Sequence, residues 1–94
     1  MMYEDLVYWH QRAQKQEVPE LTLGALNRYV SEGIPPGSFL IALLCNDLKA
    51  AFSRADDINI ANMYAIVKYC YNNIPSRCWG SPEATEEWLG EHGE

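Results

Sequence analysis

The fold is decided by the stretch from Gly33 to Ile58, which reads GIPPGSFLIALLCNDLKAAFSRADDI. Proline cannot continue a helix, and glycine readily adopts the left-handed conformation that ends one. The run of glycine and proline over 33–37 therefore predicts a stiff corner between two helices. We expect Gly33 to end the first helix in that left-handed conformation and Ser38 to serve as the N-cap of the second.

The helix after this corner is predicted to run from 39 to 55. Its apolar side chains recur at helical spacing and form one broad stripe. They are Leu40, Leu43, Leu44, Leu48, Ala51 and Phe52. Asp47 falls close to this stripe, where a carboxylate is costly unless it has a partner. We expect that partner to be a neighbouring backbone N–H or an arginine such as Arg54 or Arg28.

Two further helices are predicted before the corner. The first covers 3–16, which contains no glycine or proline, and it carries Leu6, Tyr8, Trp9 and Ala13 toward one face. The second begins near Thr22 as N-cap and ends before Gly33.

Two more helices are predicted beyond residue 55. The first runs over 58–72 with Asp57 as N-cap, and its apolar residues nearly encircle it. The last is short, with Ser81 as N-cap and Pro82 at the first helical position, and Gly90 is expected to end it. Residues 90–94 are expected to form a flexible acidic tail.

No stretch alternates in the manner of a β-strand, so the sequence predicts an all-α fold. We expect a single domain over 1–94, built as a compact bundle of four main helices plus the short C-terminal one. Five positions are predicted to lie in the core of this bundle. They are Leu44, Leu48, Phe52, Tyr64 and Val67.

Composition and charge favour a small acidic protein of the cytoplasm. Of the 94 residues, 48% are hydrophobic and 21% are charged, which is ordinary for a globular domain. The longest apolar run, 39–45, is too short for a membrane span, and Glu4 and Asp5 stand where a signal peptide would be basic. The net charge is −6, and residues 83–94 supply five acids and no base. The remaining eight acids and seven bases nearly balance, and the bases are scattered, which disfavours direct binding of nucleic acid.

Nothing in the sequence has the spacing of a catalytic or metal-binding motif. The three cysteines form no CxxC pair, and the two histidines, His10 and His92, lie near opposite ends of the chain. A reactive thiol at Cys78 would need a basic neighbour to lower its pKa. We therefore expect no enzymatic activity, no cofactor and no metal.

Four pieces of the chain carry a resemblance to a known family. They are GIPPGSFL at 33–40, NDLKAAFSRAD at 46–56, YNNIP at 71–75 and CWGSPE at 78–83. Together they resemble a family of small bacteriophage and prophage proteins whose function is uncharacterised. The resemblance implies an origin in a phage and assigns no role to any residue. Because such phages also encode inhibitors of host defence, it favours that class, which includes the anti-CRISPR proteins.

The leading hypothesis is a non-enzymatic interaction protein that binds and inhibits a host protein. Tyrosine, tryptophan and arginine are typical of binding hot spots, and the acidic C-terminal residues add charge. The candidate partner-binding residues are Trp9, Tyr69, Tyr71, Trp79, Arg54, Glu83, Glu86 and Glu87. The alternative is a nucleic-acid-binding phage regulator of helix-turn-helix type, formed by the helices between Thr22 and Phe52.

The nearly all-apolar helix over 58–72 also predicts self-association. The expected homodimer contact is its outer face, with Tyr69, Met63 and Ile66 joined by Trp79. The alternative is that the N-terminal helix covers the same face within one chain, through Trp9.

Overall fold

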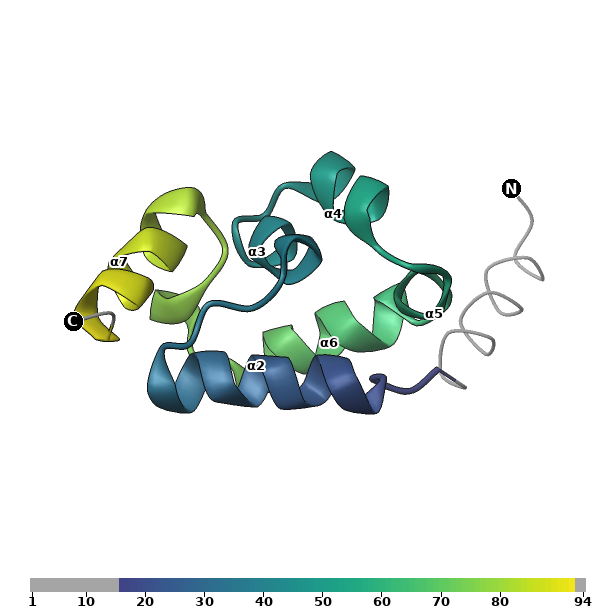
Figure 1. Ribbon diagram of the computed structural model, residues 1–94, viewed down its shortest axis with the longest axis horizontal. Coiled ribbons are helices and arrows are strands. Elements are labelled where there is room, and N and C mark those ends of the chain that lie inside the picture. Colours follow the sequence, from purple (N-terminus) through teal and green to yellow (C-terminus); the bar gives the residue numbers. More distant parts are fainter. Residues whose placement is uncertain (1–15, 93–94) are drawn as a thin grey trace.

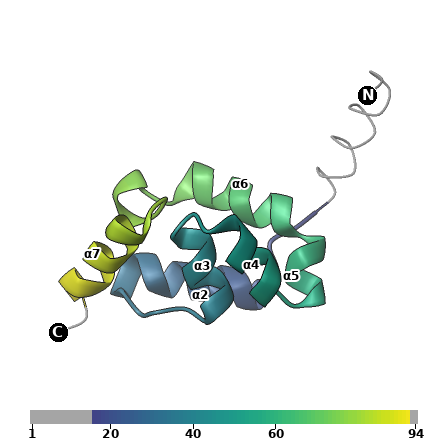
Figure 2. The same cartoon turned by 90° about the horizontal axis from the view of Figure 1, so that it is seen from above.

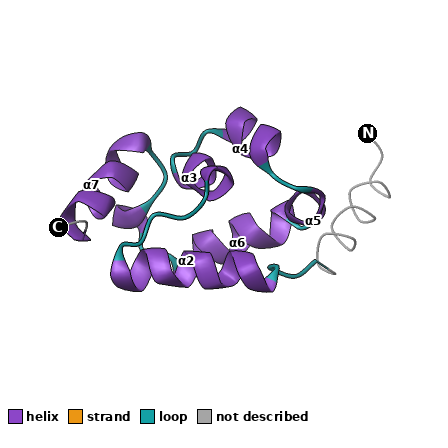
Figure 3. Cartoon of the chain, in the orientation of Figure 1, coloured by secondary structure: helices purple, strands orange, loops and turns teal. Residues whose placement is uncertain are grey.

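The computed structural model describes residues 16–92, and every regular element in that range is a helix (Figure 1, Figure 3). The elements are α2 (Glu20–Glu32), α3 (Ser38–Leu44), α4 (Leu48–Arg54), α5 (Asp57–Ala61), α6 (Met63–Asn73), the 3-10 helix η1 (Ser76–Cys78) and α7 (Pro82–His92). The all-α prediction is confirmed for these residues. The helix predicted over 3–16 lies outside the described residues except for Gln16, which is not helical.

The helices are arranged around two long neighbours, α2 and α6, which run side by side in the same direction (Figure 1). The short helices α3 and α4 pack together and cover these two from one side (Figure 2). Helix α5 lies at one end of this arrangement, and η1 with α7 lies at the other. The core fills the space between α2, α3 and α6.

The corner after α2 is built as predicted, although both predicted N-caps are displaced. Gly33 has a φ of 68°, and its N–H donates to the carbonyl of Tyr29 at 3.0 Å, so it ends α2 in the left-handed conformation. Thr22 lies inside α2 and is buried, and its hydroxyl donates to Oδ1 of Asn59 at 2.6 Å. The N-cap position of α3 belongs to Gly37, and Ser38 is the first helical residue.

The helix predicted over 39–55 is wrong, because the structure divides it into α3 and α4. Asn46 has a φ of 63°, in the left-handed region that an asparagine tolerates better than most residues. Asp47 then caps α4, since its carboxylate accepts from the N–H of Ala50 at 3.1 Å. The predicted backbone partner of Asp47 is confirmed, and its side chain is exposed.

The helix predicted over 58–72 is likewise two helices that meet at Asn62. Asp56, and not Asp57, is the N-cap of α5, and its carboxylate accepts from the N–H of Asn59 at 2.8 Å. Asn62 lies between α5 and α6, and its side-chain amide donates to the carbonyl of Ile58 at 2.9 Å. The chain changes direction at Asn62, so the apolar residues before and after it belong to two different helices. Projected onto a single predicted helix, these residues cover nearly all of its faces.

The core is centred on Tyr29, whose side chain is fully buried. Its hydroxyl donates to the carbonyl of Cys78 at 2.6 Å, and its own carbonyl accepts from Nε1 of Trp88 at 2.8 Å. These two bonds tie the end of α2 to η1 and to α7. The other fully buried apolar side chains are Leu26, Leu44, Ile66, Cys70 and Cys78.

Only Leu44 of the five predicted core positions is buried. The other four are exposed, and they are Leu48, Phe52, Tyr64 and Val67. The left-handed turn at Asn46 rotates α4 relative to α3, so the stripe of α3 does not continue onto Leu48 and Phe52. These positions were assigned to the core because an unbroken helix would have placed them there.

Helix α7 begins as predicted and ends later. The hydroxyl of Ser81 accepts from the N–H of Ala84 at 3.1 Å, as an N-cap does, and Pro82 is the first helical residue. The predicted end at Gly90 is wrong, since the helix continues to His92. One turn beyond Trp88, Glu91 reaches Arg77 at 3.7 Å, which adds a contact that favours the longer helix.

Candidate functional site

An apolar groove with a volume of about 100 Å³ lies between α4 and α6. Its apolar lining consists of Leu43, Leu48, Ala51, Met63, Val67 and Trp79. Asn46 and Asp47 also line it and are both exposed. We call this feature the α4–α6 groove.

The break between α3 and α4 supplies one wall of the α4–α6 groove. Because Asn46 and Asp47 redirect the chain, Leu48 stands outward at the first position of α4 and is 68% exposed. Ala51, one turn further on, is buried and forms the floor on this side. A leucine that is two-thirds exposed beside a hollow has apolar surface left for a partner to cover.

Helix α6 and the loop after η1 supply the opposite wall. Val67 faces the groove and is 39% exposed. Trp79 is half-buried, and the loop that carries it is held from both sides. The N–H of Gly80 donates to the carbonyl of Leu44 at 2.7 Å, and Cys78 accepts from Tyr29 as described above. The Trp79 backbone is therefore held in place between two hydrogen-bonded neighbours.

The apolar surface continues beyond the groove along both helices. Phe52 follows Leu48 by four residues on α4, and Tyr71 follows Val67 by four on α6. Residues four apart share one face of a helix. Phe52 is 43% exposed and Tyr71 is 81% exposed. Each of the two wall helices therefore carries one further exposed aromatic side chain, Phe52 one turn beyond Leu48 and Tyr71 one turn beyond Val67.

Two of the predicted partner-binding residues belong to this surface, and five others lie elsewhere. Trp79 lines the groove, and Tyr71 is exposed one turn beyond Val67 on α6. Arg54 lines a different hollow between α2, α3 and the start of α5. Tyr69 faces α2, where its hydroxyl donates to Oδ1 of Asn27 at 3.0 Å. The three acidic residues, Glu83, Glu86 and Glu87, are exposed on α7. The eighth, Trp9, lies outside the described residues.

The predicted homodimer contact needs a correction. Met63 is 8% exposed and Ile66 is fully buried, so both belong to the core and cannot form an outer face with Tyr69. The exposed apolar residues of α6 are Tyr64, Val67 and Tyr71 instead.

Two exposed groove residues that sequence reasoning missed are Leu48 and Val67, both of which were assigned to the core. One local signal could have found the first of them. Asn46-Asp47 pairs a residue that tolerates the left-handed conformation with a good N-cap, which is typical of one short helix ending and another beginning. No comparable signal marks Val67, because its exposure depends on how α4 packs.

Cys70 and Cys78 have surroundings that disfavour thiolate formation. Burial raises the pKa of the Cys70 thiol to about 12. Burial also raises the pKa of Cys78, although the adjacent Arg77 acts in the opposite direction. Between residues 16 and 92, no group of three or more histidine, cysteine or acidic side chains is placed to hold a metal ion. Nor does any helix in that range have the length and apolar content needed to cross a membrane.

Comparison of the chain with protein-family models, with curated proteins and with solved structures returned no match.

Proposed function

We propose that this chain is a small non-enzymatic interaction protein that binds a host protein through the α4–α6 groove. The observation that carries the proposal is the apolar rim of that groove, which is formed by the exposed side chains of Leu48 and Val67 and the half-buried side chain of Trp79. Exposed apolar surface around a hollow is typical of a protein-binding site. Covering the exposed part of a leucine such as Leu48 contributes about 1–2 kcal/mol to association.

The nature of the partner is proposed from the sequence resemblance. The four motif pieces resemble proteins of bacteriophages and prophages, so the partner is a protein of the bacterial host and the site of action is the host cytoplasm. Inhibition of a defence protein, as by an anti-CRISPR, is the role that this origin favours.

The alternative role, a regulator of helix-turn-helix type, has an observation against it. The recognition helix of that hypothesis begins with α3, and its N-terminal residues would need exposed polar side chains toward the major groove of DNA. Five of the seven residues of α3 are buried. They are Phe39, Leu40, Ala42, Leu43 and Leu44.

The test compares two leucine-to-aspartate variants in capture of host proteins from the bacterial host's extract. Leu48→Asp places a charge on the groove at the first position of α4, where an acidic residue suits the helix dipole. Leu21→Asp is the matched control, because Leu21 is 89% exposed on α2 and does not line the groove. We expect a host protein to be captured by the wild type and by Leu21→Asp, and to be lost with Leu48→Asp.

The captured protein is then purified and titrated calorimetrically with the same three proteins. We expect Leu48→Asp to weaken its binding at least tenfold. Equal binding by Leu48→Asp and the wild type, with unchanged circular dichroism, would refute the proposed surface.

A further inference from the structure

The α4–α6 groove has the size of a single aliphatic side chain. Its volume of about 100 Å³ is well below the roughly 300–1,000 Å³ of pockets that hold cofactors and drug-sized molecules. A cavity of about 150 Å³ holds one benzene molecule, so a branched aliphatic group, such as the isobutyl group of leucine, suits the smaller hollow here. Such a group would cover apolar surface of Leu48, Val67 and Trp79.

The groove also carries one negative charge. Asp47 is the only charged side chain among the described residues that line it, and it is exposed. One of its carboxylate oxygens, Oδ1, accepts from the N–H of Ala50 and so caps α4. Between residues 16 and 92, no hydrogen bond joins the other oxygen, Oδ2, and no basic side chain forms an ion pair with the carboxylate. Oδ2 is therefore open to a donor from a partner.

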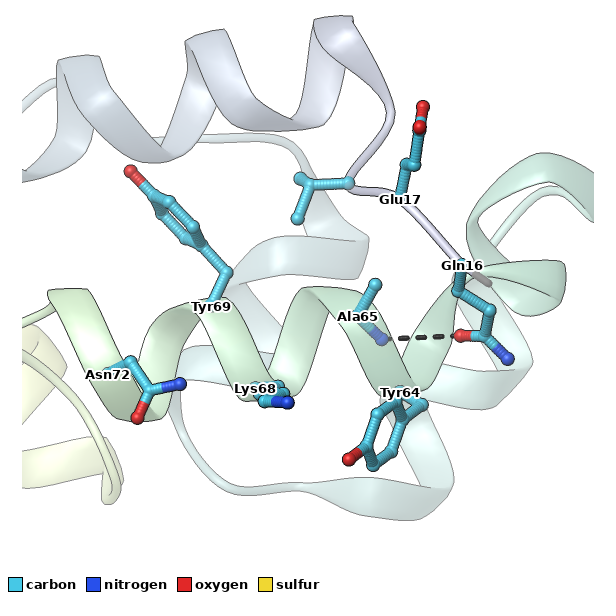
Figure 4. A pocket seen from close by; sticks show the side chains of 8 residues that line it. Gln16, Glu17, Tyr64, Ala65, Lys68, Tyr69 and Asn72 are labelled. Carbon is cyan, nitrogen blue, oxygen red and sulfur yellow. Dashed lines mark hydrogen bonds between the residues drawn. The ribbon is translucent and has the colours of Figure 1, made fainter. Parts of the chain in front are cut away.

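The lysines that follow the groove residues in the sequence do not offset this charge. Lys49 comes directly after Leu48 on α4 but does not line the groove. Lys68 comes directly after Val67 on α6, and it lines a separate hollow beside residues 16–18 (Figure 4). There its Nζ lies 5.7 Å from the centre of the Tyr64 ring. The α4–α6 groove thus combines an apolar hollow with an acidic edge.

We propose that the α4–α6 groove recognises a partner segment in which a branched aliphatic side chain stands beside a basic one. The aliphatic group enters the hollow between Leu48 and Val67, and the ammonium or guanidinium group pairs with Asp47. The inference rests on the proposed function, because it specifies the partner surface that the groove binds. An ion pair at an exposed edge adds specificity more than affinity, and it favours the basic partner roughly two- to fivefold.

Three small probes that share an isobutyl group and differ in charge test this preference on the full chain. They are isopentylammonium, isopentyl alcohol and isovalerate, each titrated at neutral pH and followed by nuclear magnetic resonance. We expect every probe to shift the methyl resonances of Leu48 and Val67 and the indole resonance of Trp79. At low ionic strength, where exposed charges are least screened, we expect the cation to bind roughly two- to fivefold more tightly than the alcohol, and the anion to bind more weakly than the alcohol.

The variant Asp47→Asn removes the charge and keeps the helix cap, because asparagine caps a helix about as well as aspartate does. Asp56→Asn is the matched control, since Asp56 caps α5 in the same way and does not line the groove. We expect the three probes to bind Asp47→Asn with nearly equal affinity. We expect Asp56→Asn to retain the order of affinities of the wild type.

The possible failures separate this inference from the proposed function. Equal binding of the three probes by the wild type, or an unchanged order of affinities in Asp47→Asn, would overturn the basic preference and leave the groove as an apolar binding surface. If no probe shifts the groove resonances, the inference is overturned, and the titrations with Leu48→Asp decide the proposed function on their own.

Analytical ultracentrifugation distinguishes a foreign partner from a second copy of the chain. We expect a single species of about 10.7 kDa. A dimer that Leu48→Asp dissociates and Leu21→Asp leaves intact would overturn the proposal and assign the α4–α6 groove to self-association.

Discussion

Removal of the Tyr29 hydroxyl by Tyr29→Phe tests the account of how the end of α2 is held. The ring is fully buried, and the hydroxyl donates to the carbonyl of Cys78, which loses this partner in the variant. Leaving a buried polar group unpaired costs roughly 1–3 kcal/mol. We therefore expect the free energy of unfolding at pH 7, measured by urea denaturation with circular dichroism, to fall by about 1–3 kcal/mol. Tyr71→Phe is the control, because Tyr71 is 81% exposed, and its effect should stay below about 0.5 kcal/mol.

The difference in stability between the wild type and Tyr29→Phe should also depend on pH. Burial raises the pKa of Tyr29 from 10.0 to about 12, so the folded state keeps this proton at pH values where the unfolded state releases it. The stabilisation is fully present below pH 10 and is lost as the pH rises from 10 to 12. Two pKa units correspond to about 3 kcal/mol. We expect the stability difference between wild type and Tyr29→Phe to close over this range. A difference that is below 0.5 kcal/mol at pH 7, or that stays constant up to pH 12, would refute the reasoning.

Three further predictions concern the α3–α4 region. Leu44→Ala should lower the free energy of unfolding by about 2–5 kcal/mol because Leu44 is buried, whereas Leu48→Ala should lower it by less than about 1 kcal/mol because Leu48 is exposed. Equal losses of the two variants in urea denaturation would contradict this difference in burial. Asn46→Ala should destabilise the fold by roughly 1 kcal/mol, because alanine adopts the left-handed conformation, here a φ of 63°, less readily than asparagine does. An unchanged denaturation midpoint would argue against the left-handed turn. A thiol reagent at neutral pH should modify Cys45, which is half-buried, before it modifies the buried Cys70 and Cys78. Simultaneous reaction of all three cysteines in the folded protein would contradict this order.

The residues that interrupt helices predicted much of the fold. Gly33 ends α2 in the left-handed conformation, and Ser81 with Pro82 begins α7, as their local chemistry requires. These features depend on one or two residues and their immediate neighbours, so the sequence is sufficient to find them. The helical nature of residues between these points follows from the spacing of apolar side chains, and it too is confirmed.

The boundaries inside the two longest predicted helices were missed for a common reason. Apolar periodicity continues through Asn46-Asp47 and through Asn62. A prediction based on spacing therefore extends a single helix through each of these sites. In each case a polar side chain makes a local bond that competes with the helix, such as that of Asp47 to the N–H of Ala50. The competition is decided by the packing gained when the chain turns.

The sequence was sufficient for the helical class, the corner at 33–37 and the start of α7, because each of these rests on backbone preferences that act over a few residues. It was not sufficient for the α4–α6 groove. Leu44 and Leu48 have the same side chain and would lie one turn apart if the helix were unbroken, yet one is fully buried and the other is 68% exposed. Burial is a property of which surfaces meet, and here it follows from a left-handed turn between the two leucines and from the loop that brings Trp79 against α4 and α6.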